Sequence, residues 1–245
     1  MNRETLPALI LALGILLSGL LVGAGFARGR SADRYVTVKG VAEREVRADA
    51  AIWPLHVIGA DNNLTAAHGK LTASIAGVKE FLAVGGIDTT QVQLTGFSVS
   101  DALAQQYGPD RAPANRYVIR QTLLVRSNRP DQVLAASQRV GELAAIGVAV
   151  SSGAGGEYGG PGSGPTFVFT QLNELKPPMI AEATARAREA AEQFARDSRT
   201  SLGGIRRANQ GVFEILARDQ APGITQESQV AKTVRVVSTV EYFLR

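Results

Sequence analysis

The sequence predicts an α+β protein in which antiparallel sheets are packed by a few helices, preceded by one N-terminal transmembrane helix. Three observations support this fold class. Several segments alternate apolar and polar residues with the period of two that is typical of half-buried strands. Other segments repeat apolar residues at steps of three and four, as on the buried face of a helix. The chain also opens with a long apolar run.

The apolar run extends from Leu6 to Ala27 and contains no charged residue. A helix of this length reaches roughly 33 Å, which is enough to cross the hydrocarbon core of a bilayer. A cleaved secretory signal is the alternative, because Arg3 precedes the run and Gly25-Phe26-Ala27 offers a cleavage site between small residues. The run exceeds the usual signal core of about 7–15 residues, so we expect an uncleaved anchor.

The charges beside this run leave its orientation open. Arg28, Arg30 and Arg34 follow it, whereas only Arg3 and the terminal amine precede it. Positive residues favour the cytoplasmic side, so the arginine count alone would place the body in the cytoplasm.

The composition of the body excludes several classes of function. The formal net charge is +4, and the first 34 residues hold four arginines against Glu4 and Asp33, which leaves only +2 for the rest. There is no basic run and no interleaving of aromatic and basic residues, so we expect no nucleic-acid partner. Cysteine is absent, which excludes disulfides, thiol catalysis and thiolate metal sites.

The first strand is predicted over Tyr35–Gly40 with a continuation through Val41–Val46, and the second over Ala50–Ile58. The second strand places an apolar set on one face, namely Trp53, Leu55 and Val57. Pro54 lies on its other face and predicts an edge or bulged position for this strand.

A helix is predicted next, because Asp61-Asn62-Asn63 offers an N-cap and Gly85-Gly86 a stop. Its apolar stripe consists of Leu64, His68, Leu71, Ile75, Val78 and Leu82. The later elements, in order, are a strand over Gln91–Ser100, a polar connection over Asp101–Asn115, a strand over Tyr117–Ser127, a helix from Pro130 that ends before Gly147, a short strand over Val148–Ser151, a mobile Gly/Ser-rich loop over Ser152–Pro165, a strand over Thr166–Thr170, a helix from about Pro177 to Leu202, and strands over Ile205–Ala217 and Lys232–Leu244.

Two patterns recur in the predicted helices. The last helix carries a stripe of mostly small residues that would sit close against a sheet: Ile180, Ala183, Ala187, Ala190 or Ala191, Phe194 and Ser198. Three helices end in a glycine that is followed by a β-branched residue and a strand, at Gly86-Ile87, Gly147-Val148 and Gly204-Ile205. We expect each of these glycines to take the left-handed cap.

Neither histidine suggests a metal or catalytic site. His68 falls on the apolar stripe, so we interpret it as a partly buried residue with a local hydrogen bond. His56 lies on the strand face opposite Trp53, where solvent or a subunit contact would meet it. No histidine or carboxylate spacing is typical of a metal site.

The other polar clusters favour structural roles. The glycine-rich segment Gly153–Gly162 is followed by a strand and has no lysine nearby, unlike a phosphate-binding loop, so we interpret it as a hairpin loop. Ser151, Ser152 and Ser163 lie in no nucleophile elbow and have no identifiable base. The charged cluster Glu43, Arg44, Glu45, Arg47 and Asp49 resembles a solvated strand edge that resists mispairing. We therefore predict no catalytic, cofactor-binding or metal-binding residue.

Taken in order, several segments resemble the SIMPL-domain family of bacterial envelope proteins, which includes the periplasmic immunogenic proteins. The segments are Val36-Thr-Val-Lys-Gly40, Ala48-Asp49-Ala-Ala51, Gly86-Ile87, Val92-Gln-Leu94, Tyr117–Val125, the Ala-rich stretch Ala181–Ala191 and the closing Val234–Tyr242. One departure is Ala48, where the family usually has proline. The resemblance covers about Tyr35 to Arg245.

The resemblance implies an exported α+β protein without established catalytic residues, with ring-like or cage-like oligomers in some members and a role in envelope or oxidative-stress physiology. It also implies a periplasmic body. We therefore divide the chain into an anchor or signal segment with a short basic linker, residues 1–34, and a SIMPL-like domain, residues 35–245. The expected location is the bacterial inner membrane, as a single-pass protein, or the periplasm after signal cleavage.

The first functional hypothesis is a non-enzymatic, membrane-tethered protein that self-associates into a homo-oligomer. Apolar residues on both faces of the second strand, with Ile52 and Ile58 opposite Trp53 and Leu55, predict a contact surface there. An alternative is a module that binds an envelope ligand or partner protein through the Gly-rich loop and the Asp101–Asn115 connection. A hydrolase with an unrecognised site is the third hypothesis.

Overall fold

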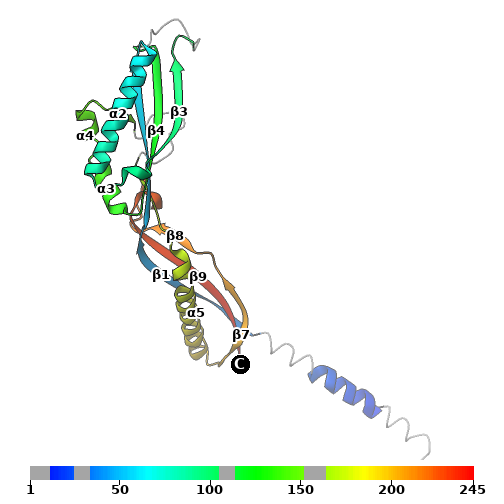
Figure 1. The fold of residues 1–245 in the computed structure, drawn as a ribbon. Coiled ribbons are helices and arrows are strands. Elements are labelled where there is room, and N and C mark those ends of the chain that lie inside the picture. Colours follow the sequence, from blue (N-terminus) through cyan, green and yellow to red (C-terminus); the bar gives the residue numbers. More distant parts are fainter. Residues whose placement is uncertain (1–11, 25–33, 105–113, 152–163) are drawn as a thin grey trace, which may run out of the picture. The chain divides into compact units, whose positions relative to one another are not determined.

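The structure is a computed structural model that describes residues 12–24, 34–104, 114–151 and 164–245 (Figure 1). The chain divides into two compact units. Unit 1 comprises Met1–Glu43, Lys176–Phe213 and Arg235–Arg245, and unit 2 comprises Arg44–Leu175 and Glu214–Val234. Helices and antiparallel strands occur in both units, which confirms the predicted α+β class.

A five-stranded antiparallel sheet forms the centre of unit 2. Its strands are β2 (Ala50–Asp61), β3 (Gln93–Asp101), β4 (Tyr117–Ser127), β5 (Val150–Ser151) and β6 (Thr166–Val168). The order is β3-β4-β2-β5, and β6 also pairs with β2. The predicted strand over Gln91–Ser100 therefore exists as β3, and it is an edge strand.

Three helices, α2 (Leu64–Val84), α3 (Pro130–Gln138) and α4 (Glu142–Ala145), lie on one side of this sheet (Figure 1). Short 3₁₀ turns occur at η1 (Thr89–Gln91) and η2 (Gln226–Ser228). The core of the unit includes Trp53, Leu55, Val57, Leu71, Val78, Leu82, Ile119, Leu123 and Val125. The alternation predicted for β2 and β4 is thus confirmed, because their apolar faces are buried beneath the helices.

The other sheet has four strands, β1 (Tyr35–Arg47), β7 (Leu202–Gln210), β8 (Glu214–Ala217) and β9 (Ala231–Leu244). Its order is β1-β9-β7, with β8 also on β9. Strands β7 and β9 are antiparallel. In unit 1, Leu244 N donates to Arg34 O at 2.9 Å, and Arg235 lies 3.3 Å from Glu43, so β1 and β9 also run in opposite directions.

Within unit 1, helix α5 (Leu172–Asp197) packs its alanine stripe closely on the sheet. The buried residues of this helix are Met179, Ala183, Ala187, Ala191 and Ala195. A Cβ added to Gly40 on β1 would overlap the backbone of Ala183 and Ala187. The predicted small-residue contact is confirmed, although Phe194 is 47% exposed and does not belong to the stripe.

The N-terminal segment is described only in part. The structure describes a helix over residues 12–24, and the remainder of Leu6–Ala27 lies outside the described residues. Among the described residues, no helix is both long enough and apolar enough to span a bilayer.

The expectation for Pro54 is wrong, because β2 is a central strand. Strand β4 pairs along one side of β2 over its whole length. On the other side, β6 pairs with residues 50–52 and β5 with residues 56–57. Pro54 falls between these two short partners, at a point where its missing N–H interrupts neither ladder.

Several element boundaries also differ from prediction. The helix that opens at Pro130 is two helices, α3 and α4. Helix α5 begins at Leu172, so Pro177 and Pro178 lie inside it, and the long strand predicted over Ile205–Ala217 is divided into β7 and β8. Most of both predicted loops, residues 105–113 and 152–163, lies outside the described residues.

Candidate functional site

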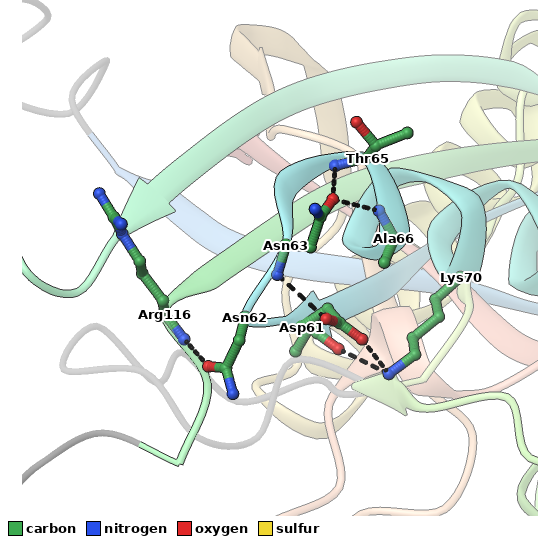
Figure 2. Close-up of polar contacts among 8 residues, drawn as sticks. Asp61, Asn62, Asn63, Thr65, Ala66, Lys70 and Arg116 are labelled. Carbon is green, nitrogen blue, oxygen red and sulfur yellow. Dashed lines mark hydrogen bonds and ion pairs between the residues drawn. The ribbon is translucent and has the colours of Figure 1, made fainter.

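A polar corner joins β2 to α2 (Figure 2). Asn63 is the N-cap of α2, and its Oδ1 accepts hydrogen bonds from Thr65 N at 2.9 Å and Ala66 N at 3.1 Å. The predicted cap is confirmed. The preceding Asn62 uses its Oδ1 to accept a hydrogen bond from Arg116 N at 3.0 Å, just before β4. Two adjacent asparagines thus hold the start of a helix and the start of a strand together.

Asp61 and Lys70 form an ion pair beside this cap, with Lys70 Nζ 2.7 Å from Asp61 Oδ2 (Figure 2). Lys70 also donates to Ala60 O at 3.2 Å, and Asn63 N donates to Asp61 Oδ1 at 3.0 Å. The hydrogen bond from Lys70, followed by that from the Asn63 backbone, lowers the pKa of Asp61. This carboxyl is therefore held ionised, which suits a structural anchor and not a general acid.

A second ion pair lies close by, between Arg116 and Asp101. Arg116 Nη2 lies 3.1 Å from Asp101 Oδ2, and its Nε donates to both carboxylate oxygens. The hydrogen bond from Arg116 lowers the pKa of Asp101. The guanidinium of Arg116 also lies 4.8 Å from the ring centre of Tyr117. This arrangement holds the ends of β3 and β4 together.

A pocket of about 420 Å³ opens next to the polar corner. Its lining is mostly apolar and comprises Ile58, Ala60, Lys70, Ala73, Ser74, Ile146, Gly147, Val148 and Ala149. The amine of Lys70 supplies a positive charge, and Ser74 supplies a hydroxyl that is nearly buried, at 9% exposure. The pocket can accept a small apolar ligand, but its lining holds no nucleophile beside a histidine or a free carboxylate.

The two histidines lie apart from this pocket. The interpretation of His68 is wrong, because its side chain is exposed and the buried stripe of α2 instead consists of Ala67, Leu71, Ser74, Val78 and Leu82. His56 Nδ1 lies 2.9 Å from Thr122 Oγ1 on the neighbouring strand. Among the described residues, no group of three or more histidines and carboxylates could hold a metal ion.

The charged cluster on β1 lies at a sheet edge, as predicted. Glu43 pairs with Arg235 at 3.3 Å, and Arg47 pairs with Asp131 at 2.5 Å. Asp49 is half-buried and accepts hydrogen bonds from the backbone and hydroxyl of Thr170. These contacts make Glu43, Arg47 and Asp49 parts of structural connections.

A buried lysine was missed by the sequence analysis. Lys232 on β9 has an exposed fraction of 0%, and its Nζ donates to Gln226 O and, at 3.2 Å, to Gln226 Oε1. Burial lowers the pKa of Lys232, and the nearby Glu227 opposes that shift. A signal was present in the sequence, because Lys232 is in phase with Val234 and the later apolar residues of β9.

Part of the exposed apolar surface of unit 2 lies on the edge strand β3, apart from exposed residues elsewhere in the unit such as Val84 and Ile146. Leu94, Phe97 and Val99 are 49%, 56% and 48% exposed. Leu94 and Val99 lie opposite the buried Leu123 and Ile119 of β4, and thus on the helix-facing side of the sheet. Helix α2 packs on β2 and β4, which leaves these side chains uncovered.

Before its last residue, Asp101, strand β3 lacks charged side chains, which are one of the common protections of an edge. From Gln91 to Ser100 the sequence has no charged residue, whereas edge strands commonly carry charges that prevent pairing with another chain. A bulge between Thr95 and Ser98 interrupts the register, with Gly96 at φ 59°. The contact surface expected at Ile52 and Ile58 stays a prediction, and both residues are half-buried on the face of β2 opposite Trp53 and Leu55.

The fold defines the class of protein: two antiparallel sheets, one packed by α2, α3 and α4 and the other by α5, without a recognisable catalytic constellation in the described residues. The SIMPL family, described as "Protein of unknown function (DUF541)", matches residues 36–242. The chain belongs to this family, which confirms the resemblance. A comparison with curated proteins finds no match.

Proposed function

We propose that this chain is a non-enzymatic protein of the bacterial inner membrane, with Leu6–Ala27 as a single-pass tether and the SIMPL domain in the periplasm. There it self-associates and supports the envelope, including its response to oxidative stress. The observation that carries self-association is the uncharged, apolar edge of β3. A second copy of the chain is the occupant that such an edge favours, because two identical edge strands can pair around a two-fold axis.

The contacts available at this edge favour a dimer. Burying a side chain such as Leu94, Phe97 or Val99 contributes about 1.5–3 kcal/mol relative to full exposure. These side chains are already half-buried, so each contributes less than this amount. In a symmetric dimer, however, both copies bury the same three side chains. Backbone hydrogen bonds along the open side of β3 would add to it.

Light scattering on the body from Tyr35 onward tests self-association. We expect an oligomer for the unchanged body and a monomer for the double variant Leu94→Lys/Val99→Lys. The matched control is Ile205→Lys/Val212→Lys, which places the same charges on exposed apolar residues of unit 1. A monomeric unchanged body at high concentration, or an oligomer that survives the β3 substitutions, would contradict the proposal.

N-terminal sequencing of native protein from separated membrane and soluble envelope fractions tests the tether. Membrane-bound protein that starts at Met1 and is digested by protease added to the periplasmic face supports it. Soluble protein that starts at Arg28 would show a cleaved signal and overturn the tether, while leaving the edge of β3 as a contact surface.

A second candidate function is the capture of a small envelope ligand, which the pocket beside Lys70 favours. Ala73 lines this pocket from the exposed side of α2, so Ala73→Trp would fill it without altering the core. We expect the unchanged protein to retain labelled cell-wall fragments and this variant to retain fewer. Equal retention by both proteins would show that the fragments do not bind in this pocket.

A further inference from the structure

At one end of unit 1, the start of β1, the end of β9, the segment before β7 and the last turn of α5 lie close together. Leu244 N donates to Arg34 O at 2.9 Å, which brings the end of β9 beside the start of β1. Ser201 and Arg245 exchange backbone hydrogen bonds of 2.8 and 2.9 Å, which adds the segment between α5 and β7. Thr200 N donates to Ala195 O at 2.9 Å and holds that segment against the last turn of α5.

This end is rich in arginine. The basic end, as we call it, carries Arg34, Arg196, Arg199, Arg206, Arg207 and Arg245. Opposing charges among the described residues come from Asp197 and Glu241. Asp197 accepts a hydrogen bond from Gln193 at 2.9 Å, and Glu241 lies 3.5 Å from Arg206. The remaining arginines leave an excess of exposed positive charge.

An aromatic side chain lies within the basic end. The guanidinium of Arg206 lies 4.0 Å from the ring centre of Tyr35. Tyr35, Arg206, Arg207 and Glu241 line a pocket of about 410 Å³, which has room for a phosphodiester group. Tyrosine beside arginine is a combination that suits the headgroup layer of a membrane, where an amphipathic ring meets anionic phosphate.

The sequence places this end next to the apolar run. Only six residues lie between Ala27 and Arg34, and an extended chain spans at most about 3.6 Å per residue step. A tethered body would therefore keep Arg34 within roughly 25 Å of the bilayer. Arg28 and Arg30, against Asp33, give the intervening segment a net charge of +1.

We propose that the basic end binds the anionic phosphate headgroups of the membrane that holds the chain. This inference rests on the proposed tether, and it adds a second, electrostatic contact that orients unit 1 against the lipid surface. The tether supplies proximity, and the arginines supply a preference for anionic lipid over neutral lipid.

The test uses the full chain with a fluorophore on a single cysteine, Ser198→Cys, because the native sequence has no cysteine. The labelled protein is reconstituted into vesicles of phosphatidylcholine alone or mixed with phosphatidylglycerol, each with an acceptor dye on a headgroup. Energy transfer then reports how close the basic end lies to the lipid surface. The charge variant is Arg34→Gln/Arg199→Gln/Arg245→Gln, and the matched control is Arg120→Gln/Arg126→Gln/Arg129→Gln, three exposed arginines of unit 2.

We expect higher energy transfer in the mixed vesicles, and its loss at about 0.5 M salt, where the screening length falls to a few ångströms. The charge variant should show the level of the neutral vesicles, while the control should behave as the unchanged chain. Equal transfer in both vesicle types, or an unaltered salt response in the charge variant, would overturn the proposal. Binding of inorganic phosphate without vesicles, together with equal transfer in both vesicle types, would identify free phosphate as the ligand and overturn the proposal.

Flotation of the same samples separates this inference from the tether. Flotation with both vesicle types at high salt supports the tether, and the energy-transfer result then decides the role of the basic end. Flotation only with mixed vesicles at low salt would overturn the tether and support lipid binding by the basic end.

Discussion

Lys232 shows at the residue scale how a charge is accommodated where the strand pattern requires an apolar side chain. Lys232 is buried on β9, and its ammonium group donates hydrogen bonds to two oxygens of Gln226. The lysine thereby connects β9 to the turn η2. The pattern alone could have identified a lysine in phase with buried residues, but the identity of its partner depends on the path of the chain around η2.

The pH dependence of stability follows from this burial. Burial lowers the pKa of Lys232 below its ordinary value of 10.5, so the folded chain releases this proton at a lower pH than the unfolded chain. Between the lowered pKa and 10.5 the unfolded state binds more protons, and this group's contribution to stability rises with pH. In thermal unfolding at a series of alkaline pH values, we expect Lys232→Met to lack this rise. An identical pH profile for both proteins would contradict the burial of a charged amine.

At the scale of elements, the close contact between α5 and β1 depends on the absence of a side chain at Gly40. Gly40→Ala would force its Cβ into the backbone of Ala183 and Ala187, and overpacking of this kind costs about 1–3 kcal/mol. Gly204→Ala is the control, because a Cβ there meets nothing within 4 Å. We expect urea unfolding to show a clear loss of stability for Gly40→Ala and almost none for Gly204→Ala. Equal losses would mean that the helix does not approach the strand so closely.

The same elements show which features local sequence can predict. Gly86 and Gly147 take the expected left-handed cap, with φ of 75° and 78°, because the cap requires a conformation that glycine adopts freely. The third predicted cap is wrong: Arg199 has the positive φ, at 54°, and Gly204 lies within β7. The chain turns before it reaches the glycine, because the backbone pairing of Ser201 with Arg245 already begins the sheet.

Tertiary contacts explain the remaining errors. A proline normally marks the first turn of a helix, but α5 begins upstream of Pro177 and loses the hydrogen bonds that this residue and Pro178 cannot donate. The side chain of His68 is exposed because Ala67, and not His68, faces the sheet on the turn of α2 before the buried Leu71. The sequence shows that β3 carries apolar residues. It does not show that they are exposed, because their exposure depends on α2 packing on β2 and β4 and not on β3.

At the scale of the whole molecule, we predict a protein that is held at one membrane and that binds copies of itself. The tether and the basic end would fix unit 1 at the lipid surface, while the edge of β3 in unit 2 would supply the contact between copies. Neither role requires a catalytic residue. The absence of charge along β3 would then be a requirement of assembly, since a lysine there would oppose pairing.

Cross-linking between copies of β3 tests the central claim most directly. Single cysteines replace Leu94, Phe97 or Val99 in the cysteine-free full chain, and Ile205→Cys on β7 serves as an equally exposed control. After mild oxidation of intact membranes, we predict a disulfide-linked dimer from at least one β3 position, and its loss when Thr95→Lys is added beside it. Dimer from β3 at no more than the level of the Ile205→Cys control would contradict assembly through this edge.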